Sequence, residues 1–142
     1  MKNAGGVFLS AVAALAIAAI PATAAPKPQV ITFVSVQTGT HDLNTTPHEV
    51  VINDKDISGN KTVGHDVITC KVNGPKVLGC VFVFSLAKGN ITVKSGAVKA
   101  NTGPSNGMIT GGTRAYAGAH GSAAFKTLNQ AKGIVQITLT LK

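Results

Sequence analysis

Five carboxylic acids and four histidines are the side chains of this 142-residue chain that could exchange a proton near neutral pH. Asp66 is the most informative acid, because strict alternation along its predicted strand puts it on the side of Ile68 and Cys70. If that side faces the interior, desolvation raises the pKa of the Asp66 carboxyl and makes it a candidate catalytic acid or base. If Asp66 instead lies near the rim of the fold, it is hydrogen-bonded there or exposed, and both positions stay open.

The other titratable residues indicate less chemistry. Asp54 and Asp56 lie beside the turn residues Ser58, Gly59 and Asn60 and are predicted to be turn-forming residues. The spacing of the histidines matches no metal-binding motif, and H-E-x-x-H and paired C-x-x-C motifs are absent, so neither a metal site nor a metal cofactor is predicted. A G-x-S-x-G motif is absent as well, which leaves a hydrolase triad without support.

A secretory signal peptide is predicted at the start of the chain. Lys2 precedes the uncharged apolar run Val7 to Ile20, and Ala22-Thr23-Ala24 forms an A-x-A cleavage site. The run is shorter than the roughly twenty residues that a membrane-spanning helix needs. The sequence therefore predicts cleavage after residue 24, a secreted, extracellular protein with no membrane insertion after cleavage, and a single domain over residues 25–142.

Two cysteines, Cys70 and Cys80, occur in a chain that is predicted to reach an oxidising compartment. The turn signal Asn73-Gly74-Pro75 between them places the two cysteines opposite each other on neighbouring strands. A disulfide is therefore predicted, and a catalytic thiol is the alternative.

The elements that must position these residues are β-strands. After Pro28, period-two patterns recur between turn residues, and no stretch shows a sustained i, i+3, i+4 apolar pattern. The last strand is the clearest, because Ile137 and Leu139 fall on one side while Gln136 and Thr138 fall on the other. The eight predicted strands are Gln29–Gln37, His48–Asn53, Thr62–Val72, Val77–Leu86, Ile91–Lys99, Gly107–Gly111, His120–Leu128 and Gly133–Leu141.

Short links between successive strands favour antiparallel neighbours, and eight such strands without covering helices can close into a barrel. The predicted fold class is therefore all-β, a single eight-stranded antiparallel β-barrel, with a two-sheet sandwich as the alternative. The interior of such a barrel holds its own side chains or one small ligand. Because Phe82 and Phe84 face one side of their strand and Val81 and Val83 the other, the outer face either meets a neighbouring subunit or reflects the ordinary preference of strands for β-branched residues.

The chain is basic, with thirteen Lys and Arg residues against five acids. The lysines are scattered singly, Arg114 is the only arginine, and no group of stacking aromatics accompanies them, so nucleic acid is not a predicted partner. The charge is interpreted as a source of solubility and of weak attraction to anionic cell surfaces.

The glycine-rich run ITGGTRAYAGAHG, Ile109 to Gly121, resembles the G-G-T-G-x-[FY]-x-G-A-x-G signature of the dirigent and allene oxide cyclase barrel family, especially its small exported bacterial members. Two upstream segments are similar to the family as well: Val51 to Cys70, where an aspartate, a glycine and a Val-Gly pair precede a cysteine, and Phe84 to Gly96, which contains L-x-x-G-x-I. The resemblance implies an eight-stranded antiparallel barrel, commonly a trimer, with a pocket at one end for a small apolar molecule and with no metal or organic cofactor.

The resemblance also suggests where a ligand would be held. Arg114 and Tyr116 would stand at the barrel mouth as ligand contacts; alternatively, Tyr116 is packed in the core and Arg114 is solvated. The family usually has glycine where Arg114 stands, so no role is carried over to it. Dirigent members often have a pocket arginine where His120 stands, so here a titrating imidazole replaces a fixed charge. Phe82 and Phe84 are the predicted apolar ligand contacts.

Three functions stay open at this stage. The first is a barrel that binds a small hydrophobic molecule in its lumen and guides its cyclisation or coupling without a cofactor. The second is a true isomerase in which Asp66 or His120 is the catalytic acid or base. The third is a non-catalytic binding or structural surface protein, whose lumen the phenylalanines would fill. The first predicted strand, QVITFVSVQ, contains no acid, whereas allene oxide cyclases carry a pocket glutamate there, and this argues against that particular cyclisation.

Overall fold

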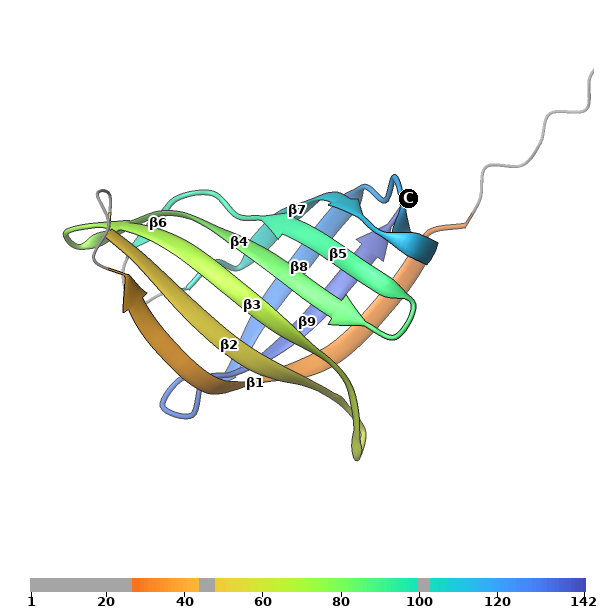
Figure 1. The fold of residues 1–142 in the computed structure, drawn as a ribbon, viewed down its shortest axis with the longest axis horizontal. Helices are drawn as coiled ribbons and strands as arrows, with labels where there is room; N and C mark the ends of the chain where they lie inside the picture. Colours follow the sequence, from red (N-terminus) through yellow and green to blue (C-terminus); the bar gives the residue numbers. More distant parts are fainter. Residues whose placement is uncertain (1–26, 44–47, 100–102) are drawn as a thin grey trace, which may run out of the picture.

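The computed structural model of the protein describes residues 27–43, 48–99 and 103–142, and these residues form an all-β barrel (Figure 1). The predicted signal peptide, residues 1–24, lies outside the described residues. Among the described residues the one helical element is a three-residue 3-10 turn, which is far too short to span a membrane. The elements are β1 (Gln29–Leu43), β2 (His48–Ser58), β3 (Lys61–Asn73), β4 (Lys76–Leu86), β5 (Gly89–Lys94), β6 (Val98–Lys99), β7 (Asn106–Gly112), η1 (Arg114–Tyr116), β8 (Gly121–Asn129) and β9 (Ile134–Leu141).

The sheet closes on itself. Its strand order is β3-β2-β1-β9-β8-β7-β5-β4, and the two outermost strands, β3 and β4, pair with each other. Every pairing is antiparallel, and β6 adds a two-residue ladder to the start of β4. The predicted eight-stranded antiparallel barrel is therefore confirmed, and the sandwich alternative is excluded. Closure pairs β3 and β4, which would otherwise be edge strands along their whole length.

The predicted strand Ile91–Lys99 is divided into β5 and β6. At Ser95 the backbone N–H donates to the Cys80 carbonyl oxygen at 2.9 Å, and the Ser95 hydroxyl accepts from the Cys80 N–H at 3.1 Å. These two bonds end the regular β4–β5 ladder, and pairing resumes only where Val98 meets Val77. The period-two pattern of the sequence continues across this break, so it could not reveal it.

The core follows from alternation along the strands. On β9, Ile137, Leu139 and Leu141 are buried, whereas the alternating residues are half-buried, as the sequence pattern predicts. Aromatic rings fill the middle of the barrel: the ring of Phe84 meets Phe33 edge-on with centroids 5.5 Å apart, and Phe82 stacks on Phe125 at 4.6 Å.

The barrel has two ends, which are named here by one residue each. The Pro104 end contains the β3–β4 turn, the segment 103–105 and the β8–β9 turn. The Arg114 end contains the β2–β3 turn, the β4–β5 turn, η1, and the residues at which the described chain enters and leaves the barrel. In Figure 1 the Arg114 end lies on the right, where the C-terminus is marked.

Glycine is required where η1 packs onto β5. A Cβ atom on Gly112 would lie 2.5 Å from the carbonyl oxygen of Tyr116 and 2.7 Å from that of Asn90. The two carbonyls belong to backbone that cannot move aside, so only glycine fits at this crossing. This close approach explains part of the glycine-rich run.

Candidate ligand site: an apolar cavity with a buried carboxyl cluster

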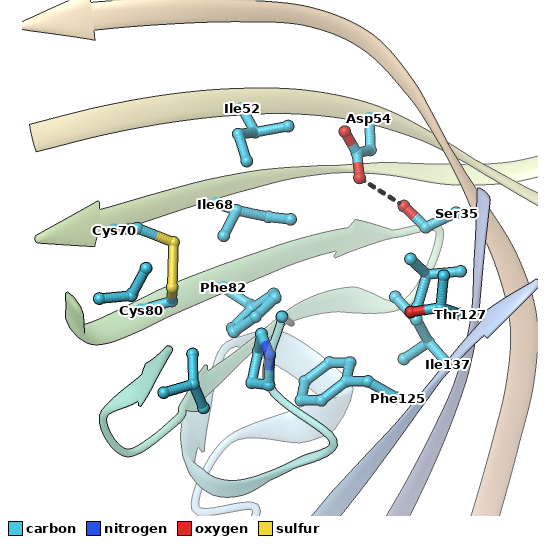
Figure 2. A pocket seen from close by; sticks show the side chains of 15 residues that line it. Ser35, Ile52, Asp54, Ile68, Cys70, Cys80, Phe82, Phe125, Thr127 and Ile137 are labelled. Atoms are coloured by element: carbon cyan, nitrogen blue, oxygen red, sulfur yellow. Dashed lines mark hydrogen bonds between the residues drawn. A yellow bond between two sulfur atoms is a disulfide. The ribbon is translucent and has the colours of Figure 1, made fainter. Parts of the chain in front are cut away.

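A cavity of about 250 Å³ lies inside the barrel at the Pro104 end. Figure 2 shows Phe82 and Phe125 on one side of it and Ile52 and Ile68 on the other. Asp54 is the only ionisable side chain among the described residues of its wall. The lining residues are mostly apolar: Ser35, Ile52, Asp54, Ile68, Cys70, Val77, Cys80, Phe82, Val98, Gly103, Pro104, Phe125, Thr127, Val135 and Ile137.

Asp54 belongs to a cluster of three buried carboxyls. Asp54 and Asp56 lie two residues apart on β2 and therefore point to the same, inner face. The β2–β3 register places Asp66 directly opposite Asp54. The exposed fractions of Asp54, Asp56 and Asp66 are 6%, 0% and 1%, so all three carboxyls are withdrawn from water.

The Ser35 hydroxyl on β1 joins two of these carboxyls. Its Oγ lies 2.8 Å from Oδ2 of Asp54 and 2.9 Å from Oδ2 of Asp66. A hydroxyl has one proton and can donate to only one of them. The other contact is a hydrogen bond only when that carboxyl is itself protonated and donates to Ser35. The geometry therefore indicates that at least one carboxyl of the pair holds a proton.

Burial and mutual repulsion raise the pKa of each acid above the ordinary value of 3.8. For Asp54 the pKa rises to about 6, mainly through burial and then through the nearby Asp66 charge, while the Ser35 hydrogen bond opposes the rise. For Asp66 the pKa rises to about 8, again mainly through burial, and then through a hydrogen bond and charge repulsion with Asp56. Burial likewise raises the pKa of Asp56, to about 6, and the bond to Asp66 holds it down. Asp66 is thus the group that keeps its proton longest.

Four carboxyl oxygens of the cluster receive no hydrogen bond from a hydroxyl or N–H group in the described part of the chain: Oδ1 of Asp54, both oxygens of Asp56, and Oδ1 of Asp66. The contact between Asp56 and Asp66 is a hydrogen bond only when one of the two is protonated. When Asp66 is protonated, it can donate to its neighbour Asp56, which two ionised carboxylates cannot do. A buried carboxylate without a donor is costly. The cluster is therefore suited to holding protons or to receiving a donor from a ligand at Asp54. Among the described residues, no three His, Cys, Asp or Glu side chains are arranged to hold a metal ion.

Several predicted site residues lie in or beside this cavity. Asp66 is buried, which decides between the two positions left open by the sequence, but it reaches the cavity only through Ser35 and Asp54. Phe82 is part of the cavity wall, whereas Phe84 lies beneath it, fully buried in the core. The predicted disulfide is confirmed.

The disulfide between Cys70 and Cys80 has an S–S distance of 2.03 Å, and the two cysteines are direct partners in the β3–β4 register. Both Cys70 and Cys80 line the cavity, so the disulfide fixes the wall on this side. Because both sulfur atoms are in the disulfide, the catalytic thiol considered from the sequence is excluded in this state.

Arg114, Tyr116 and His120 lie at the other end of the barrel, away from this cavity. Tyr116 is buried against the core, and Arg114 is exposed. His120 is also exposed, and its nearest polar contact is Nδ1 with the Gly118 carbonyl oxygen at 3.4 Å. The structure does not bring His120 together with Asp66.

The prediction that Asp54 and Asp56 are turn-forming residues is wrong. β2 continues to Ser58, and the turn is formed by Gly59 and Asn60. Both carboxyls therefore sit on the inner face of a strand. The signal that could have found them is the alternation that places Asp54 and Asp56 on the side of Ile52. Ser35, buried on β1, was not singled out by any sequence pattern.

Three solved structures share this fold. A pyocyanin demethylase has 20% identity with this chain and a TM-score of 0.66, covering 80% of this chain and 100% of its own. The pterocarpan synthase dirigent protein GePTS1 has 17% identity and a TM-score of 0.62, covering 90% and 98%. The pterocarpan synthase dirigent protein PsPTS1 has 16% identity and a TM-score of 0.56, covering 81% and 93%. No protein-family model matches the chain, and no curated protein does either. At these identities the similarity establishes a dirigent-like barrel fold.

Proposed function

We propose that the barrel binds one small apolar molecule in the Pro104-end cavity and moves a proton on it, as a cofactor-free isomerase of the cyclase type. The observation that carries this proposal is the position of Asp54. Its carboxyl is the one ionisable group among the described lining residues, which are mostly apolar, and burial brings its pKa to about 6, close to physiological pH. A general acid or base is most effective when its pKa lies near the working pH.

The cavity wall defines the class of ligand. Phe82 and Phe125 offer aromatic surface, and the polar atoms come from Ser35, Asp54 and Thr127. None of the described side chains that line the cavity is cationic, so a carboxylate or phosphate on the ligand would meet the carboxyl cluster without compensation from them. A neutral or cationic ring compound with an O–H or N–H donor fits best, because its donor can satisfy the free Oδ1 of Asp54.

The Ser35 bridge supports proton exchange without a cofactor. Ionised Asp54 would remove a proton from one atom of the bound molecule and return it to another atom of the same molecule, so no net proton is needed. Asp66 is linked to Asp54 by two hydrogen bonds through Ser35. By keeping its own proton, Asp66 would limit the negative charge of the cluster while Asp54 is ionised. In this scheme Asp54 is the catalytic residue, and Ser35 and Asp66 position and tune it.

A guided cyclisation or coupling is the second candidate. The two dirigent proteins of the same fold are named as pterocarpan synthases, and the cavity here would likewise hold a flexible molecule in one conformation. The two candidates differ in their dependence on the carboxyl: guidance by shape needs the cavity wall, whereas isomerisation needs Asp54.

We propose in addition that the protein is secreted and that it forms a trimer. The disulfide between Cys70 and Cys80 is typical of extracellular proteins and supports secretion. The outer face carries Val67 and Val81, each 37% exposed, on the paired strands β3 and β4, and a neighbouring copy of a trimer would cover them. Light scattering of the purified protein measures this directly, and a monomer at all concentrations argues against the trimer.

The test uses two probes with the same ring system. We expect 2-naphthol, which is neutral and has an O–H donor, to bind in calorimetric titrations, and we expect 2-naphthoate to bind at least tenfold more weakly. Asp54→Asn should abolish catalysed exchange of ligand protons with deuterated solvent, followed by NMR over a panel of neutral enones and phenols. Asp42→Asn is the matched control, because Asp42 is an exposed acid at the same end of the barrel.

Binding of neither probe at millimolar concentration would contradict the ligand site. Binding without exchange for any compound of the panel would leave the non-catalytic binding protein as the better description. Exchange that survives Asp54→Asn would refute the role of that carboxyl.

A further inference from the structure

The barrel carries its charges unevenly. Three of the five acids are the buried carboxyls of the cluster, so Asp42 and Glu49 are the acids that reach the surface in the described part of the chain. Both lie at the Pro104 end, at the β1–β2 hairpin. The two ion pairs found among the described residues also lie there: His48 with Asp42 at 4.0 Å, and Lys71 with Glu49 at 3.9 Å.

The Arg114 end is cationic and unneutralised. Its basic side chains are all exposed, they come from different loops around the rim, and none has an ion-pair partner among the residues that the structure describes. The only acidic side chain nearby is Asp56, which is buried inside the barrel. The basic residues of this end are Lys27, Lys61, Lys88, Arg114 and Lys142.

The backbone of Arg114 adopts a conformation that is unfavourable for a residue with a Cβ atom. Its φ is +53°, and it is the one non-glycine residue of the described chain with a positive φ. Glycine adopts this conformation without the steric cost that a Cβ atom imposes. The guanidinium is exposed, so packing does not explain why an arginine occupies the position. A role in contacting something outside the barrel does explain it.

A groove of about 240 Å³ lies beside it on the same end. Lys27 and Lys142 line the groove, and the rest of its wall consists mostly of small residues of the segment 115–119. Small side chains leave this groove open beside two cationic residues.

We propose that the Arg114 end docks on an anionic lipid surface, with the Pro104-end cavity facing away from it. Cations distributed around a rim suit a flat surface of phosphate groups, whereas a nucleic acid strand is followed by a linear stripe of cations with stacking aromatics. All aromatic side chains of the described chain are buried, which argues against nucleic acid. Each cation near an anionic membrane strengthens binding by roughly 1 kcal/mol, or about fivefold.

The test measures sedimentation of the full chain with vesicles. We expect binding to vesicles of phosphatidylcholine and phosphatidylglycerol at 2:1, a large loss of binding when NaCl is raised from 0.05 to 0.5 M, and little binding to pure phosphatidylcholine. Binding through the apolar segment Val7 to Ile20 would not depend on lipid charge, so binding to the neutral vesicles measures the contribution of that segment. Lys61→Gln with Lys88→Gln should weaken binding to the anionic vesicles roughly 25-fold.

Lys76→Gln with Lys132→Gln is the matched control, because it removes two exposed cations from the opposite end and changes the net charge equally. Equal losses in the two double variants would overturn the proposal, since net charge alone would then explain the binding. Absence of binding at low salt, or binding to heparin that is tighter than to anionic vesicles, would overturn it as well. None of these residues lines the cavity, so the result does not depend on whether the proposed isomerase activity is correct.

The variant Arg114→Gly tests whether Arg114 is kept for membrane binding or for the stability of the fold. We expect this variant to bind anionic vesicles about fivefold more weakly and to unfold at a higher urea concentration than the wild type, because the backbone strain is relieved. Loss of stability, or unchanged binding, would show that Arg114 is kept for a structural reason.

Discussion

Replacing Asp66 by asparagine should change how the stability of the barrel depends on pH. The asparagine side chain has the size of a protonated aspartate, can still donate to Ser35 or Asp56, and does not ionise. In the wild type, burial raises the pKa of Asp66 from 3.8 to about 8. Between these two values the folded state holds a proton that the unfolded state has lost. The free energy of unfolding therefore falls as the pH rises through this window and is constant above it.

The size of the effect follows from the two pKa values. For Asp66 alone, the free energy of unfolding falls by roughly 3 kcal/mol between pH 4.5 and pH 7. Asp66→Asn removes this contribution, because the asparagine side chain does not bind the proton. Relative to the wild type, the variant should gain roughly 3 kcal/mol over the same interval. Asp54→Asn should gain less, roughly 2 kcal/mol, and its gain should level off by about pH 7, because the pKa of Asp54 is about 6.

The assay is urea denaturation followed by circular dichroism at half-unit steps from pH 4.5 to 8.5. Asp42→Asn is the control for the same chemical change outside the cluster, since the Asp42 carboxyl is exposed. A wild-type stability that rises with pH in this window would refute the reasoning. So would a constant gap between Asp66→Asn and the wild type, because the proton would then not reside in this cluster.

Three further predictions concern the packing that holds the site. Replacing Cys70 and Cys80 together by alanine should lower the free energy of unfolding by about 2–3 kcal/mol, since the disulfide closes a loop with a sequence separation of ten; urea titrations of the variant and of the reduced wild type should agree. Gly112→Ala should destabilise the fold by about 1–3 kcal/mol, because its Cβ would lie 2.5 Å from the Tyr116 carbonyl oxygen, and unchanged thermal unfolding would contradict this geometry. Phe125→Ala should cost about 3 kcal/mol or more and enlarge the cavity, so that a ring compound larger than 2-naphthol gains affinity relative to 2-naphthol in calorimetry.

The fold was predictable because its signals are local. The alternation of Ile137, Leu139 and Leu141 fixes the inner face of β9, and the turn around Pro75 brings Cys70 opposite Cys80. What the sequence could not show is pairing that depends on distant contacts. The end of β5 is decided by the bonds between Ser95 and Cys80, which no period-two pattern contains.

The site was harder to predict than the fold. Asp66 could be placed on an inner face by alternation, but its partners depend on the register between β2 and β3. That register is set in part by the irregularity between Asp56 and Ile57, which lets β2 run past the expected turn. Two acids next to a glycine have the composition of a turn, so local preference suggested the wrong position for Asp54 and Asp56. Ser35 reaches both carboxyls because β1 pairs with β2 in a register that places Ser35 opposite Asp56, next to Asp54, and β2 in turn pairs Asp54 with Asp66.

Burying three carboxyls in one cluster has consequences for both ends of the barrel. On the surface, it leaves Asp42 and Glu49 as the exposed acids of the described chain, so the basic side chains of the Arg114 end are not neutralised. In the interior, Ile52 and Ile68 show that the same wall accepts apolar side chains, which need neither a donor nor a proton. Replacing a buried charged group by an apolar one is often stabilising. Stability alone therefore does not account for carboxyls at these positions, whereas the proton transfer proposed for the cavity would.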